Sequence, residues 1–128
     1  MNGTMRKLGG SGIKVSPMGL GCWAIGGLFT LFGQADGWGA VDDAESIRAV
    51  RRAVELGVSF FDTADAYGTG HSEEVLGKAL KGMRSSVVIA TKGGYVHDRE
   101  KREIYGEDTS PAYIRGALEA SLRRLDTD

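Results

Sequence analysis

The chain has 128 residues, of which 41% are hydrophobic and 26% are charged, so its composition is that of one globular domain and excludes a disordered or fibrous protein. Its 16 basic and 17 acidic residues give a formal net charge of -1, which argues against nucleic acid or an anionic membrane surface as a partner. The chain has one cysteine and no apolar run long enough for a signal peptide or a membrane span, which predicts a cytoplasmic protein.

Short apolar runs and glycine-rich turns make up the first third of the chain. A β-hairpin is predicted over residues 5–16, because a Gly-Gly-Ser-Gly turn at 9–12 separates two apolar runs. A short buried strand is expected at 18–23. The long glycine-rich loop at 26–41 belongs to a class of loops that is often functional. It carries three aromatic side chains that look exposed, namely Phe29, Phe32 and Trp38.

From Asp42 onward, apolar strands alternate with amphipathic helices. Asp42 and Glu45 have the spacing of a capping box, and Ser110-Pro111 combines an N-cap residue with a first-position proline. The predicted elements are, in order, a helix at 42–57, a strand at 58–62, a helix at 72–81, a strand at 87–91, a polar segment at 97–108 and a helix at 110–125.

This alternation predicts an α/β fold with parallel β/α units at about 18–57, 58–82 and 86–126. Three such units fit either a doubly wound open sheet or part of a (β/α)8 barrel, and periodicity does not separate the two. In both folds the functional site lies at the carboxyl ends of the strands.

Three residues of matching chemistry are expected at that edge. Asp62 ends one predicted strand, Lys92 ends the next, and Tyr67 lies in the loop after Asp62. A phenol is a weak acid with a pKa of about 10, and an adjacent lysine ammonium stabilises its phenolate form. The trio therefore predicts a tyrosine general acid that protonates a carbonyl oxygen while a cofactor supplies hydride. The same residues also fit a structural ion pair with a tyrosine packed over it.

The remaining polar candidates favour ordinary structural roles. The stretch Gly19-x-Gly21-x-x-Ala24 loosely matches a dinucleotide fingerprint, but no helix is expected after it, so a tight turn is favoured. His71 is expected at a helix entrance and His97 in a solvated loop, and no metal site is predicted. Cys22 is interpreted as a small buried residue and not as a nucleophile.

The aromatic residues near the first predicted strand have two interpretations. They either line an apolar substrate pocket or plug the end of the sheet. They are Trp23, Phe29, Phe32 and Trp38.

Several segments together resemble the aldo-keto reductases. They are MRKLG at 5–9, SGIKVS at 11–16, GLGCW at 19–23, GVSFFDTADAYG at 57–68, SEEVLG at 72–77 and ATK at 90–92. The resemblance implies a (β/α)8 TIM-type barrel whose bottom is closed by an N-terminal hairpin, with this chain supplying the hairpin and about three β/α units. It also implies NADPH-dependent reduction of aldehydes and ketones, with a small carbonyl compound as substrate.

The resemblance assigns roles to individual residues. It implies that Asp62, Tyr67 and Lys92 are three members of a catalytic tetrad, with Tyr67 as proton donor. It places Gly21, Cys22, Trp23 and Asp62 at the cofactor, and Trp23, Trp38 and Tyr67 at the substrate. The fourth tetrad member, a histidine after the next strand, has no counterpart here.

A complete barrel needs about 250 residues, so the chain alone is expected to be inactive. An alternative function is a non-catalytic partial barrel that associates with another copy or with a complementary fragment through its open sheet edges. A weaker alternative is an open-sheet nucleotide-binding module that uses the Gly19–Ala24 turn.

Overall fold

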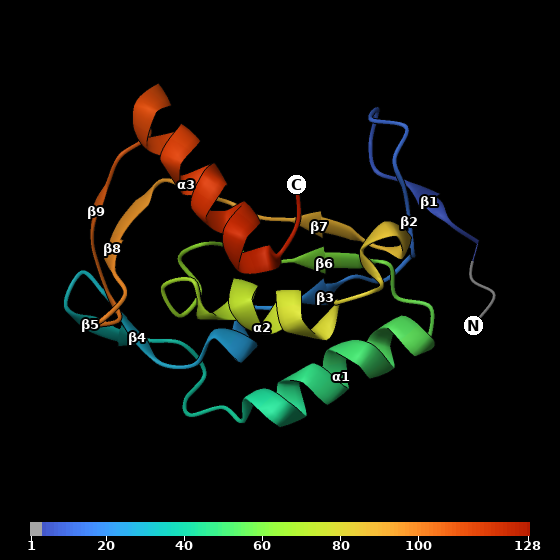
Figure 1. Cartoon of the computed structure of the whole chain (residues 1–128), viewed down its shortest axis with the longest axis horizontal. Coiled ribbons are helices and arrows are strands. Elements are labelled where there is room, and N and C mark those ends of the chain that lie inside the picture. Colours follow the sequence, from blue (N-terminus) through green and yellow to red (C-terminus); the bar gives the residue numbers. More distant parts are fainter. Residues whose placement is uncertain (1–3) are drawn as a thin grey trace.

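Three parallel strands form the centre of the structure, a computed structural model that describes residues 4–128 (Figure 1). They are β3 (Leu20–Gly21), β6 (Phe60–Asp62) and β7 (Val88–Ala90), in the order β3-β6-β7. Phe61 of β6 lies opposite Leu20 of β3 and Ile89 of β7. The predicted parallel α/β arrangement is therefore confirmed.

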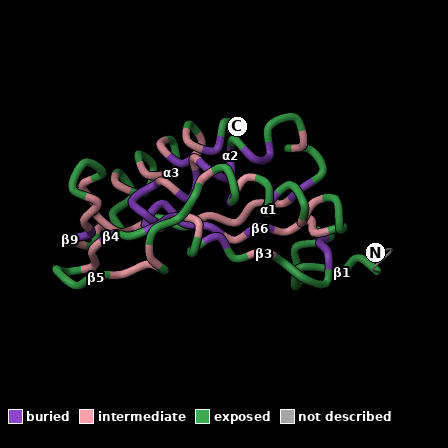
Figure 2. Tube along the Cα trace, turned by 90° about the horizontal axis from the view of Figure 1, so that it is seen from below, coloured by how far each residue is buried: buried purple, intermediate pink, exposed green. Residues whose placement is uncertain are grey.

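Three helices cover one face of this sheet (Figures 1 and 2). They are α1 (Asp43–Glu55), α2 (His71–Ala79) and α3 (Pro111–Leu125). The predicted caps are confirmed, because the Glu45 N–H donates to Asp42 Oδ1 (2.8 Å) and the Tyr113 N–H donates to Ser110 Oγ (3.3 Å). Within residues 4–128, no helix is long and apolar enough to cross a membrane.

The main core lies between the sheet and these helices. Phe61 is fully buried at its centre. The other members come from the residue after β3, from the three helices and the residue after α2, and from the segment that leads into β7, namely Cys22, Val50, Leu76, Ala79, Leu80, Val87 and Leu125. In Figure 2 the buried parts of the trace accordingly concentrate between the helical layer and the strands.

A small hairpin closes the end of the sheet where the parallel strands begin (Figure 1). It consists of β1 (Arg6–Lys7) and β2 (Lys14–Val15), which pair antiparallel. Two reciprocal hydrogen bonds attach it to the sheet: the Ser16 N–H donates to Ser59 Oγ (2.8 Å), and the Ser59 N–H donates to Ser16 Oγ (2.9 Å). The 3-10 turn η2 (Arg84–Ser86) precedes β7.

A second sheet stands at the opposite end, beside the carboxyl ends of the parallel strands (Figure 1). Its strands are β5 (Gln34–Asp36), β4 (Phe29–Leu31), β9 (Glu103–Glu107) and β8 (Tyr95–Asp98), in that order. The expectation of an irregular loop at 26–41 and a plain polar segment at 97–108 is therefore wrong.

Two residue predictions fail with that loop. Phe29, expected to be exposed, is 6% exposed and packs with Ala64, Ala66 and Ile104 in a second core. His97, expected in a solvated loop, lies half-buried in β8, and burial lowers its pKa. Both corrections have one cause, because pairing of β4 with β9 converts the two loops into a sheet whose inner face is covered.

Candidate active site

Asp62, Lys92 and Tyr67 meet at the carboxyl edge of the parallel sheet. Asp62 is the last residue of β6, and Lys92 follows β7 by two residues. Lys92 Nζ donates to Asp62 Oδ1 (2.8 Å) and to the Thr63 carbonyl (2.7 Å), and it lies 5.1 Å from the centre of the Tyr67 ring. The side chains of Lys92 and Asp62 are half-exposed, so this cluster is open to a small molecule.

Neighbouring side chains favour the charged form of Lys92. Partial burial alone would lower the pKa of the Lys92 ammonium, but the adjacent Asp62 carboxylate and Tyr67 hydroxyl outweigh burial and raise it. Lys92 therefore carries a positive charge beside the tyrosine ring at neutral pH.

The loop that carries Tyr67 is fixed by buried hydrogen bonds to three elements. The Thr63 N–H donates to the Ala90 carbonyl (2.8 Å), and the Asp65 N–H donates to the Lys92 carbonyl (3.0 Å). Ser72 Oγ at the start of α2 donates to the Cys22 carbonyl (2.7 Å) and lies 2.9 Å from Thr63 Oγ1. Sequence reasoning missed Ser72, although a small hydroxyl in the first turn of a helix that follows the loop is a usable signal.

Trp23 packs beside Tyr67, and Trp38 packs against Trp23. The Trp23 ring lies 6.4 Å from the Tyr67 ring and 6.0 Å from the Trp38 ring, which meets it edge-on at 87°. Trp23 is 38% exposed and Trp38 is 71% exposed. Phe32 contacts Tyr95 instead, with ring centres 6.2 Å apart. The aromatic residues thus divide into a group at Tyr67, a pair on the second sheet, and the buried Phe29.

The end of β3 leaves space above its backbone. Gly21 pairs with Asp62, and a Cβ added to Gly21 would meet no atom within 4 Å. Cys22 is different, because it is fully buried, and burial raises the pKa of its thiol to about 12. Its side chain is thus removed from any molecule on the rim, as expected for a small buried residue.

The proposed fingerprint turn opens no helix. It leads into the 3-10 turn η1 (Ala24–Gly26), which is three residues long. A dinucleotide fingerprint needs a helix N-terminus at this place to receive the pyrophosphate. The weak match over Gly19–Ala24 is therefore a tight turn.

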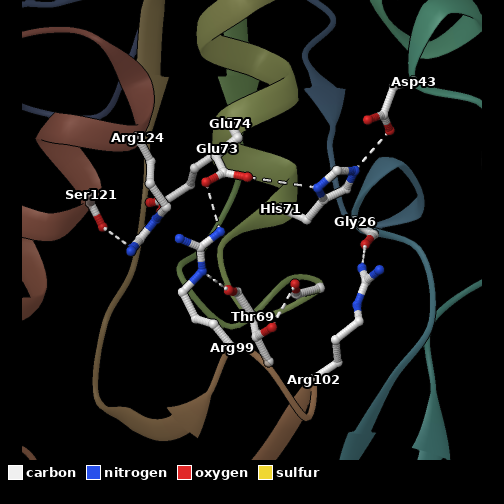
Figure 3. A network of polar contacts seen from close by, with 11 residues as sticks. Gly26, Asp43, Thr69, His71, Glu73, Glu74, Arg99, Arg102, Ser121 and Arg124 are labelled. Atoms are coloured by element: carbon white, nitrogen blue, oxygen red, sulfur yellow. Dashed lines mark hydrogen bonds and ion pairs between the residues drawn. The ribbon is translucent and has the colours of Figure 1, made fainter.

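A buried ion pair behind the loop was not foreseen. Glu73 of α2 is fully buried, and its Oε2 accepts from Arg124 Nε of α3 (2.6 Å); both residues are drawn in Figure 3. Its Oε1 accepts from Thr91 Oγ1 (2.6 Å). Asp65 is 2% exposed, and burial, reinforced by the negative charge of Glu73, raises its pKa to about 6. Glu73 and Arg124 are 51 residues apart, so no local pattern predicts the pair.

Neither histidine joins the cluster around Tyr67. His71 is the first residue of α2, as expected, and its Nε2 lies 2.7 Å from Asp43 Oδ1, with Glu74 on its other side (Figure 3). The described residues contain no group of three metal-ligating side chains.

Most of this chain matches known proteins. A family model described as "Aldo/keto reductase family" matches residues 17–128. The aldo-keto reductase YhdN of Bacillus subtilis (strain 168) is 41% identical over 120 residues, which are 92% of this chain and 33% of that protein.

Two solved structures are also similar. Aldo-keto reductase AKR11C1 from Bacillus halodurans (holo form) matches with a TM-score of 0.81 and 37% identity, over 98% of this chain and 37% of that one. An aldo/keto reductase from Klebsiella pneumoniae in complex with NADP and acetate matches with a TM-score of 0.69 and 31% identity, over 93% and 34%. The chain therefore spans about a third of these relatives, and the structural neighbours are (β/α)8 barrels.

Proposed function

The chain belongs to the aldo/keto reductase family and forms part of its (β/α)8 barrel, and from that premise we propose that the protein reduces aldehydes and ketones to alcohols with NADPH. The observation that carries the proposal is the cluster of Tyr67, Lys92 and Asp62 on an open rim. NADP in the similar Klebsiella pneumoniae structure supports the choice of cofactor.

In the proposed reaction, Tyr67 is the proton donor. The substrate carbonyl gains a hydride at carbon and a proton at oxygen, and the proton leaves the Tyr67 hydroxyl. Lys92 stabilises the phenolate that remains, and Asp62 holds Lys92 through the 2.8 Å bond to Nζ. The second bond of Nζ, to the Thr63 carbonyl, fixes the direction of the ammonium.

Residues at the end of β3 suit the nicotinamide part of the cofactor. The open space above Gly21 admits a flat ring against the backbone, and Asp62 and the exposed Trp23 ring border it. When bound there, the dihydronicotinamide supplies the hydride. Trp23 and Trp38 then form an apolar wall for the carbonyl substrate beside Tyr67.

A chimera tests this assignment. Residues 17–128 replace the matching segment of the Klebsiella pneumoniae relative, and oxidation of NADPH by a reactive aldehyde is followed by absorbance. We expect turnover that falls at least about 100-fold in Tyr67→Phe. A chimera that folds and turns over equally well with phenylalanine at this position contradicts the proposed proton donor.

The 128-residue chain alone is expected to turn over little or nothing, because it spans a third of the barrel. Saturable NADPH binding with Tyr67-dependent turnover by this chain would overturn that expectation. Its fluorescence during NADPH titration reports binding, since Trp23 and Trp38 lie at the proposed site.

The alternative function, self-association, has one observation in its favour. Within residues 4–128, β3 and β7 each pair with one neighbouring strand only, and unpaired edges favour association. Sedimentation measures it directly. A monomer with a single cooperative melt would count against this alternative.

A further inference from the structure

Two arginines of one turn contact the loop that carries Tyr67 and the turn η1 beside it. They lie in the turn between β8 and β9 (Figure 3). Arg99 Nε donates to the Thr69 carbonyl (3.0 Å), and its Nη2 donates to Glu74 Oε1 (2.7 Å). Arg102 Nη2 donates to the Gly26 carbonyl (2.6 Å). The second sheet is thus linked to the candidate site from two directions.

The Gly26 contact leads directly to Tyr67. A Cβ added to Gly26 would lie 2.8 Å from the carbonyl carbon of Tyr67 and 2.9 Å from the nitrogen of Gly68. In the reverse direction, a Cβ on Gly68 would overlap the Gly26 carbonyl oxygen. The peptide after Tyr67 therefore packs directly against Gly26, and the Gly26 carbonyl accepts a hydrogen bond from Arg102.

The Thr69 contact stabilises an unfavourable backbone conformation. Thr69 has φ 53, in the left-handed region that β-branched residues rarely adopt, and Gly68 and Gly70 on either side also have positive φ. Thr69 is 1% exposed, so surrounding contacts must hold it in this conformation. The hydrogen bond from Arg99 to its carbonyl is one such contact.

We propose that Arg99 and Arg102 are positioning residues, which set the Tyr67 ring against Lys92 by fixing Thr69 and Gly26. This proposal rests on the proposed reductase function, in which Tyr67 is the proton donor. Neither arginine is bonded to the Tyr67 hydroxyl, so they act through the backbone of the loop. The guanidinium group suits this work because it stays charged and donates in a fixed fork.

The test uses the 128-residue chain with carbon-13 labels in its tyrosine rings. The Tyr67 signal is assigned by its absence in Tyr67→Phe. In the parent chain, Lys92→Met is expected to shift this signal, because the ammonium lies 5.1 Å from the ring centre. In the Arg99→Ala, Arg102→Ala background we expect that response to be lost, and amide exchange over residues 64–70 to quicken about tenfold.

Controls separate positioning from general loss of structure. Arg115 is exposed on α3, and Arg115→Ala is expected to change neither readout. When Arg102→Lys takes the place of Arg102→Ala, a donor toward Gly26 is restored. This variant is expected to recover part of the Tyr67 signal shift caused by Lys92→Met. If the double variant does not fold, the single variants Arg99→Gln and Arg102→Gln are measured in the same way.

Folded variants that keep the parent response to Lys92→Met and the parent exchange rates would overturn the proposal. Both readouts are independent of turnover. A failed reductase assay with a positive result here would therefore refute the proposed reaction and leave the positioning role intact.

Discussion

Replacing Glu73 by glutamine is expected to lower the free energy of unfolding by about 3 kcal/mol. Glu73 is fully buried, and Arg124, its partner at 2.6 Å, is only 10% exposed. The amide keeps the shape of the carboxylate but removes its charge, so the buried guanidinium of Arg124 loses the anion that it contacts directly. Arg124 then retains the weaker bond to Ser121 Oγ at 3.3 Å.

Urea unfolding measures this loss, and a thermal melt should show a fall of roughly 10 °C in Tm. The matched control is Glu55→Gln. It breaks the ion pair between Glu55 and Arg52, whose side chains are 63% and 66% exposed, and it is expected to cost less than about 0.5 kcal/mol.

A second substitution at Arg124 is expected to restore part of the lost stability. Because the penalty comes from an unpaired buried charge, adding Arg124→Met to Glu73→Gln is expected to recover at least about 1 kcal/mol. A loss below about 1 kcal/mol in Glu73→Gln, or a double variant less stable than the single one, would refute the claim that this pair is a desolvated charge pair.

Three further predictions concern buried groups. Gly68→Ala is expected to lower the free energy of unfolding in urea by about 3 kcal/mol, because a Cβ would overlap the Gly26 carbonyl. Gly33 also has positive φ but lies in open space, so Gly33→Ala is expected to cost about 1 kcal/mol. Equal losses would mean that the overlap contributes nothing. The folded-state pKa of Asp65, about 6, lies above its ordinary value of 3.8, so the stability it contributes is present below pH 4 and lost as pH rises through 6. Between pH 4 and 6 we expect the free energy of unfolding of the parent to fall by about 3 kcal/mol relative to that of Asp65→Asn. Parallel profiles of unfolding free energy against pH would contradict this. The Cys22 thiol is expected to resist a disulfide reagent at pH 8 until urea unfolds the chain, and rapid labelling of folded protein would show that it is accessible.

Local signals predicted the helices and the parallel strands. Asp42 and Ser110 cap helices in the structure because each cap is a contact between residues three apart, which is visible in a short window. The meeting of Asp62 and Lys92 was also predictable, because neighbouring parallel strands end at the same edge. Their catalytic roles stay predictions.

The second sheet was missed for an identifiable reason. Phe32 and Gly33, between β4 and β5, both have positive φ, which is the backbone of a tight type I′ hairpin turn. Asparagine or glycine is usual at the first of these positions, so a phenylalanine there does not predict a turn. The buried pair of Glu73 and Arg124 was missed because its partners lie on different helices.

The parallel pairing of β4 with β9 has a consequence for the order of folding. Thr30 pairs with Glu103, more than 70 residues away, so this ladder forms only after a long loop has closed. The β3-β6-β7 sheet and its helices involve shorter separations and are expected to assemble first. Because Arg99 and Arg102 lie in the turn that leads into β9, the region around Tyr67 gains its final geometry in the last step. A refolding experiment should then recover helical circular dichroism before the native fluorescence of Trp23 and Trp38.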